Sequence, residues 1–286
     1  MIIDFHTHTF PDAIASAAVR SLRAASHTRP FTDGTARGLK ESMAASGIDL
    51  SVILPVATKA RQVTHINDGA VRINETSADT GLLSFGCAHP DMEDPAGEIR
   101  RLKARGVPGI KLHPPYQGVP IDDIRYLRIL QAAGEEGLIV TIHAGIDIGL
   151  PDALYAMPEM IRRAVDQAGP VTLVLAHMGS WRCWDRLGCL EGTHVYLDTS
   201  FSLGELCPDG EGYHTGESRK LLDPERFIRL CRAFGMDRIL FGTDSPWADQ
   251  GKARADIEAL PLTEEEKRAI LGGNAARLLG LTQPAV

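Results

Sequence analysis

The sequence predicts an α/β fold, a single (β/α)8 TIM barrel over residues 1–286. Eight apolar runs of strand length recur along the chain, and amphipathic segments separate them. The runs lack the polar alternation of a half-exposed sheet, which is typical of parallel strands covered on both faces. Parallel strands joined by helices form a closed barrel or an open doubly wound sheet, and eight strands favour the barrel.

The eight predicted strands follow from the apolar runs in order. They lie at residues 2–8, 50–57, 82–89, 109–113, 138–143, 171–177, 195–200 and 238–244. The first run, IIDFHTH, is not followed by the glycine-rich loop of a dinucleotide-binding fold. The doubly wound alternative is therefore disfavoured.

Helices are predicted between these strands. Residues 121–136 carry apolar residues at three-residue spacing: Ile121, Ile124, Leu127 and Leu130. Residues 223–234 begin with Asp223 and Pro224, which suit the cap and first turn of a helix. Two longer segments, 9–35 after the first strand and the polar, glycine-rich 202–222 after the seventh, are expected on the barrel face that carries the chemistry.

Composition narrows the classes of function. The net charge of -7 has the wrong sign for binding nucleic acid, and no apolar run approaches the roughly 18 residues that span a membrane. The five cysteines are scattered without a C-x-x-C pair, so neither a disulfide framework nor a thiolate metal cluster is expected. We expect a cytoplasmic protein with a small-molecule partner. The sequence leaves the oligomeric state open, a homo-oligomer included.

Titratable residues stand where the predicted strands end. Because strand side chains alternate between faces, Asp4, His6 and His8 point the same way. The last inward residues of five strands form one set: His8, His113, His143, His177 and Asp244. A single inward histidine is more often a hydrogen-bonded core residue than a ligand. Together with His6, however, five of only 10 histidines stand at strand ends, which indicates a divalent cation shared by imidazoles and a carboxylate.

Six short motifs carry a resemblance to a known family. The segments DFHTH, GIKLHP, IHAG, LAHMG, GTDSPW and ILGGNAARLLGL occur in this order. Together they resemble the amidohydrolase superfamily, and within it the amidohydrolase-related (amidohydrolase 2) family of metal-dependent hydrolases and decarboxylases. The resemblance runs from residue 2 to about residue 281.

The resemblance implies one metal ion, with His6, His8, His143 and Asp244 as ligands. Zinc is the first expectation, while manganese and iron tolerate the same ligands. His177 would act on the substrate or on a second ion. In binuclear relatives a strand-four lysine, as its carbamate, bridges two metals, which makes Lys111 a candidate. Lys111 and His113 could instead meet a substrate anion or be structural.

The chemistry expected of such a site is attack by an activated water on a small, carboxylated substrate at a C–O or C–N bond. Asp244 would be the base, and His177 would polarise the carbonyl. Asp4 would accept a hydrogen bond behind the ligands or lie deeper in the barrel. Nonoxidative decarboxylation of an aromatic or unsaturated acid is the alternative, although decarboxylases with this pattern tend to be longer. A barrel that binds without turnover is the third reading.

Substrate residues are predicted from the loops that follow the strands. Trp181 and Arg182 follow the sixth strand, and Arg182 could grip a carboxylate with both ends of its guanidinium group. Tyr213 lies in the long polar segment, and Trp247 follows Asp244. Each of these four residues could instead serve only packing or the helix surface.

Overall fold

The computed structural model describes residues 1–210 and 212–281, and the chain divides into two compact units. Unit 1 combines Met1–Ile53 with the described residues from Asp198 onward, and unit 2 is Leu54–Leu197. The prediction of one domain over residues 1–286 stays a prediction. Among the described helices, none has both the length and the apolar character needed to cross a membrane.

Unit 1 is built around strand β1. Its elements are β1 (Ile3–Thr7), β2 (Leu50–Ile53), β9 (Ile239–Leu240), α1 (Asp12–Ser26), α2 (Ala36–Ser46), α9 (Pro224–Phe234), α10 (Gln250–Glu258), α11 (Glu264–Arg268) and α12 (Asn274–Leu278). Strand β1 pairs in parallel with β2. On its other side, the Phe5 amide donates to the Phe241 carbonyl and the Asp244 amide donates to the His6 carbonyl. Backbone bonds on both sides therefore fix β1, which carries His6.

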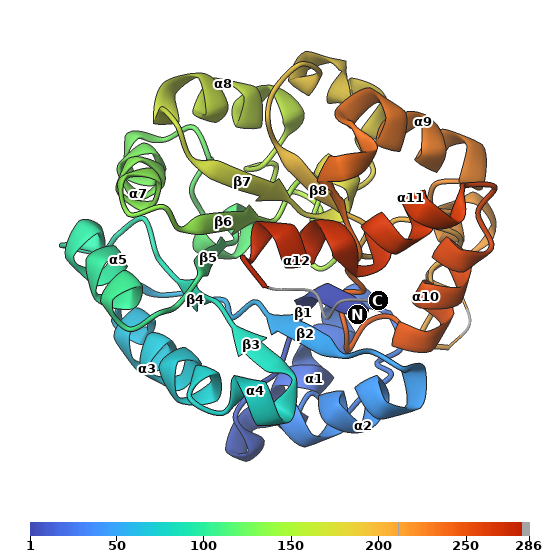
Figure 1. The fold of residues 1–286 in the computed structure, drawn as a ribbon, viewed down its shortest axis with the longest axis horizontal. Coiled ribbons are helices and arrows are strands. Elements are labelled where there is room, and N and C mark those ends of the chain that lie inside the picture. Colours follow the sequence, from blue (N-terminus) through green and yellow to red (C-terminus); the bar gives the residue numbers. More distant parts are fainter. Residues whose placement is uncertain (211, 282–286) are drawn as a thin grey trace. The chain divides into compact units, whose positions relative to one another are not determined.

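Unit 2 holds a run of parallel strands. Its elements are β3 (Leu82–Ser84), β4 (Gly86–Cys87), β5 (Gly109–Leu112), β6 (Ile139–Ile142), β7 (Thr172–Leu175), α3 (Val63–Asn74), α4 (Ser77–Thr80), α5 (Pro95–Ala104), α6 (Pro114–Gln117), α7 (Ile124–Glu135) and α8 (Pro158–Ala168). Strands β4 to β7 pair in parallel in chain order, and β7 pairs with the start of β8 (Tyr196–Asp198). Helices α3, α5, α7 and α8 lie along one side of these strands (Figure 1).

Every predicted strand segment contains a strand, but each strand is shorter than predicted. The segment 82–89 divides into β3 and β4. Two asparagines of α3 bond the backbone here: Asn74 pairs with both the amide and the carbonyl of Ser84, and Asn67 does the same with Cys87. The two asparagine side chains therefore bond backbone groups that a continuous strand would pair with a neighbouring strand.

The helix predictions are confirmed at α9 and partly wrong at α7. Helix α9 begins at Pro224, and the Asp223 carboxylate caps it by accepting from the Arg226 amide at 2.8 Å. Helix α7 begins at Ile124, which is 58% exposed. Strict three-residue spacing rotates by about 60° per step around a helix, so four such residues cannot share one buried face. The buried face of α7 is formed by Tyr126, Leu127, Ile129, Leu130, Ala132 and Ala133.

The two long segments of unit 1 bond to each other. Residues 9–35 contain helix α1, so most of this segment is helical rather than loop. The Arg29 amide donates to the Cys207 carbonyl at 2.9 Å, and Nε2 of buried His214 donates to the Ser26 carbonyl at 2.8 Å. The polar segment 202–222, of which residue 211 lies outside the described residues, is thus tied to the end of α1.

Candidate metal centre

Three predicted ligands of unit 1 converge where β1 ends. Nε2 of His6 lies 3.1 Å from Nε2 of His8, and both nitrogens face Oδ1 of Asp244, at 3.4 and 3.0 Å respectively. The His6 side chain is 1% exposed, whereas those of His8 and Asp244 are 18% and 14% exposed. The triad is therefore buried on the His6 side and accessible on the other.

The spacing of these three atoms fits a divalent cation. Ligands about 2.0–2.1 Å from a metal are roughly 3.3–3.4 Å apart at tetrahedral angles and roughly 2.9–3.0 Å apart at right angles. The observed distances of 3.0, 3.1 and 3.4 Å span these values. Two imidazole nitrogens and one carboxylate oxygen are also ligands that zinc, manganese and iron accept. The triad can accordingly hold one such ion.

Asp244 is placed by an unusual backbone conformation. It lies four residues beyond the end of β9, with a φ of +67°, in the left-handed region that few residues other than glycine adopt. Its amide donates to the His6 carbonyl at 2.8 Å, and its carbonyl accepts from the Trp247 amide at 2.9 Å. The prediction that Asp244 is the last inward residue of a strand is thus wrong, although its carboxylate does reach His8.

The approach of the two chain segments depends on Gly242. A Cβ atom at this position would lie 2.9 Å from Cβ of His6 and 3.5 Å from Cβ of Asp198. Contacts below 3.0 Å between such atoms are not tolerated without movement. Glycine therefore lets the segment before Asp244 lie against His6.

Behind the triad, two polar residues hold the other nitrogen of His6. Nδ1 of His6 lies 2.9 Å from Oδ2 of Asp198 and 3.0 Å from Oγ of Ser200. All three residues are at most 1% exposed. Asp198 thus has the position behind a ligand that the sequence assigned to Asp4.

Asp4 supports the site through the backbone. Its carboxylate accepts from the amides of His6 and Thr243, from the Thr243 hydroxyl and from Nε2 of Gln250. Burial raises the pKa of Asp4 to about 7, and these four hydrogen bonds hold it from rising further. The carboxylate therefore ties β1 to the segment that carries Asp244. These contacts agree with the alternative prediction that Asp4 lies deeper in the barrel than the ligands.

A second cluster of titratable residues lies in unit 2. The rings of His113 and His143 stack with centroids 4.2 Å apart and planes inclined by 20°. Oδ2 of Asp147 lies 3.6 Å from Nε2 of His113 and 3.9 Å from Nε2 of His143. Nδ1 of His143 lies 3.1 Å from Nε2 of His177. All four side chains are buried.

The stacking of His113 on His143 argues against one cation shared by this pair and Asp147. An imidazole binds a metal along the lone pair of its nitrogen, in the plane of the ring. Rings stacked at 4.2 Å with planes inclined by 20° hold their nitrogen lone pairs in nearly parallel planes. Nδ1 of His113 also accepts from the Tyr116 amide at 3.4 Å, which favours a proton on its Nε2 facing Asp147.

A family model identifies the family of this chain. The amidohydrolase model matches residues 3–281, nearly the whole chain. The chain belongs to the amidohydrolase family. This confirms the resemblance carried by the six motifs, and it makes the chain an amidohydrolase-type enzyme of a metal-dependent family. Among curated proteins, none matches the chain.

Solved structures show the fold of this amidohydrolase. An uncharacterized TIM-barrel protein from Bordetella bronchiseptica is 18% identical, with 98% of each chain covered and a TM-score of 0.72. A candidate 2-pyrone-4,6-dicarboxylic acid hydrolase from Pseudomonas putida is 19% identical, with 99% of this chain and 98% of that chain covered and a TM-score of 0.65. The 5-carboxyvanillate decarboxylase of Novosphingobium aromaticivorans, solved with bound manganese, is 16% identical, with 98% and 97% covered and a TM-score of 0.69. The predicted barrel fold is thereby confirmed.

The remaining predicted residues of the amidohydrolase are distributed over both units. His143, His177, His113 and the buried Lys111 belong to unit 2, so their roles as ligand, second-ion or substrate residues stay predictions. In the same unit the Arg182 guanidinium lies 4.8 Å from the centre of the Trp181 ring, and burial lowers its pKa. This contact places Arg182 against its neighbour, and the role of both residues toward a substrate stays a prediction.

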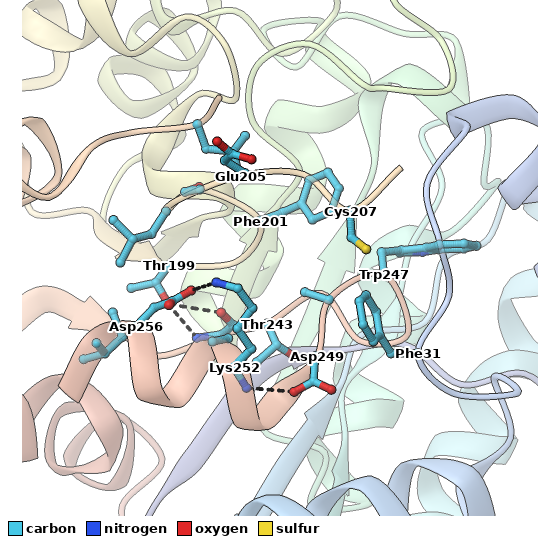
Figure 2. Close-up of a pocket in the computed structure, with 17 residues that line it drawn as sticks. Phe31, Thr199, Phe201, Glu205, Cys207, Thr243, Trp247, Asp249, Lys252 and Asp256 are labelled. Carbon is cyan, nitrogen blue, oxygen red and sulfur yellow. Dashed lines mark hydrogen bonds and ion pairs between the residues drawn. The ribbon is translucent and has the colours of Figure 1, made fainter. Parts of the chain in front are cut away.

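Two predicted substrate residues of unit 1 lie in different surroundings. Tyr213 is 59% exposed and stacks on His27 with ring centroids 3.7 Å apart. Trp247 lines a cavity of about 70 Å³ together with Phe31 and Phe201 (Figure 2). At its polar end Lys252 pairs with Asp256 at 2.5 Å. Of the described residues that line the cavity, none is a triad residue, so it lies beside the metal centre and is not part of it.

Sequence reasoning missed Asp198, Ser200 and Asp147. Asp198 and Ser200 stand two apart in LDTS, at the end of the seventh predicted strand, where strand alternation would have placed both side chains on one face. Asp147 lies in the loop four residues after His143. The signal for Asp198 and Asp147 was an acid near a strand end, as for Asp244, and the signal for Ser200 was its place two residues after Asp198.

Proposed function

We propose that this amidohydrolase hydrolyses a C–O or C–N bond of a small carboxylated substrate at a divalent-metal centre held by His6, His8 and Asp244. The observation that carries the proposal is the convergence of two Nε2 atoms and one carboxylate oxygen within 3.0–3.4 Å of one another. His8 and Asp244, with side chains 18% and 14% exposed, form the accessible side of this centre.

The class of substrate is supported by the solved relatives. Two of them are named for carboxylated compounds, a pyrone dicarboxylic acid and carboxyvanillate. Because these relatives are only 19% and 16% identical to the chain, they support the chemical class of the substrate and not a particular compound. We expect zinc as the ion, with manganese the main alternative, since a relative binds it.

A divalent ion bound here would lower the pKa of a coordinated water toward neutrality. The side chains of the protein would orient the ligands and supply the base that takes a proton from the water. Oδ1 of Asp244 lies beside both imidazoles, and its side chain is 14% exposed, so this carboxylate can take a proton from an attacking water. His6, held from behind by Asp198, keeps the geometry fixed. We assign to His177 polarisation of the substrate carbonyl and to His143 the fourth ligand position, as the sequence predicts.

Metal content tests the first half of the proposal. Purified protein should contain about one equivalent of zinc, manganese or iron, and His8→Ala should lose it. His65→Ala is a matched control, because His65 is an exposed histidine of α3. Equal metal content in wild type and His8→Ala, or no metal in either, contradicts the proposal.

Product analysis in labelled water tests the reaction. A panel of lactones and amides that carry a carboxylate should give products with one solvent oxygen. Release of CO2 without solvent oxygen would identify decarboxylation instead. Binding without turnover would support a ligand-binding barrel.

A further inference from the structure

We propose that Asp198 and Ser200 are positioning residues that fix the His6 imidazole in its Nδ1–H form, with the lone pair of Nε2 aimed at the metal. This inference rests on the proposed function, because it assigns a purpose to the form of His6 that binds an ion. It concerns two residues outside the triad. Both are buried completely.

The contacts around Nδ1 decide which nitrogen carries the proton. Oδ2 of Asp198 lies 2.9 Å from Nδ1 of His6, and an ionised carboxylate can only accept. The Ser200 hydroxyl donates to Oδ1 of Asp198, so its oxygen presents a lone pair to Nδ1, 3.0 Å away. The Ser200 amide also donates to Oδ1 at 3.1 Å, which holds the carboxylate in place. Both neighbours of Nδ1 therefore demand a donor there.

The consequence appears at the other side of the ring. A neutral imidazole has one N–H, so a proton on Nδ1 leaves Nε2 with a lone pair that can bind a metal. This lone pair faces Oδ1 of Asp244 at 3.4 Å and Nε2 of His8 at 3.1 Å. Nε2 of His6, Nε2 of His8 and Oδ1 of Asp244 can all direct a lone pair at one cation placed among them.

A merely structural role for Asp198 makes a different prediction. A carboxylate kept only for core hydrogen bonding would stabilise the fold but leave metal affinity unchanged once the protein is folded. A carboxylate that orients a ligand changes affinity even in a folded variant, typically 10–100-fold for such partners. The two roles are separated by measuring the proton position and the affinity, neither of which needs a known substrate.

The first measurement uses chelator-treated full-length protein labelled with ¹⁵N histidine, at a pH where imidazoles are neutral. Long-range ¹H–¹⁵N spectra report the protonated nitrogen of each ring, and His6→Ala identifies the His6 signals by their loss. Wild type should show Nδ1–H at His6, and Asp198→Asn should shift His6 toward Nε2–H. An Nε2–H form in wild type overturns the inference.

The second measurement is zinc affinity by competition with a chromophoric chelator. Asp198→Asn should bind zinc 10–100-fold more weakly. Ser200→Ala keeps the Asp198 carboxylate, so its loss of zinc affinity should be smaller. This variant replaces Asp198→Asn in the test if Asp198→Asn does not fold. Ser26→Ala is the matched control: its buried hydroxyl bonds that of Thr28 at 2.7 Å, and the variant should bind zinc as wild type does. Unchanged affinity in folded Asp198→Asn overturns the inference.

The metal content of the wild-type protein distinguishes failure of the proposed function from failure of this inference. If wild type binds no zinc, manganese or iron, the metal centre is wrong, and the positioning role falls with it even where His6 is Nδ1–H. If wild type binds metal and Asp198→Asn binds equally well, only the positioning role is wrong.

Discussion

Gly242 sets how closely the segment that leads to Asp244 approaches His6, and Gly242→Ala tests this directly. The added methyl group would lie 2.9 Å from Cβ of His6, a contact that ordinary packing places at 3.4 Å or more. One segment must therefore move by about half an ångström. Both segments are fixed by backbone bonds between His6 and Asp244, so the strain falls on the triad itself.

Gly242→Ala should reduce both the stability of the fold and the affinity for zinc. Overpacking of a fixed core costs about 1–3 kcal/mol, which for a chain of this length lowers the Tm by about 2–6 °C. Metal ligands tolerate errors of only about 0.2 Å, so a shift of half an ångström should weaken zinc binding by about tenfold or more. The loss of affinity should exceed what the change in stability alone would produce.

Thermal unfolding measures the loss of stability, and chelator competition measures the loss of zinc affinity. Gly69→Ala is the matched control, because Gly69 lies within α3 and its added Cβ would have only Arg72 within 4 Å, at 3.8 Å. That variant should gain up to about 1 kcal/mol and bind zinc as wild type does. Wild-type Tm and wild-type zinc affinity in Gly242→Ala would refute the packing argument.

Three further predictions concern other parts of the chain. His143→Ala should reduce metal content if His143 is the fourth ligand, as the sequence predicts; elemental analysis that finds full metal content contradicts that role. Because burial raises the pKa of Asp4 to about 7, the folded state keeps a proton that the unfolded state loses near pH 4. Stability should therefore fall between about pH 4 and 7, by up to about 4 kcal/mol, and urea unfolding of chelator-treated Asp4→Asn should lack this slope. His214→Ala removes the buried bond to the Ser26 carbonyl, so the segment 202–222 should become sensitive to proteolysis while the Tm falls by only a few degrees; unchanged protease resistance would show that other contacts suffice.

The convergence of the three candidate ligands could be predicted because their signals are local. His6 and His8 are two residues apart on a strand whose side chains alternate, and Asp244 follows the last apolar run in a recognisable motif. Strand ends in a parallel α/β fold gather on one face, so residues at strand ends are natural site candidates. The exact strand ends were less predictable, since β9 spans only Ile239–Leu240 and Asp244 stands in a left-handed turn beyond it.

The sequence by itself determined the α/β class, the order of the strands, the family and three converging candidate ligands, because apolar periodicity and short motifs are properties of neighbouring residues. Only the tertiary structure decided which polar group stands behind His6. Asp198 is 192 positions away from its imidazole partner, and Asp4, two residues away, bonds Thr243 and Gln250 instead. Hydrogen bonds require atoms within about 3 Å, and that proximity between distant segments arises only when the chain folds.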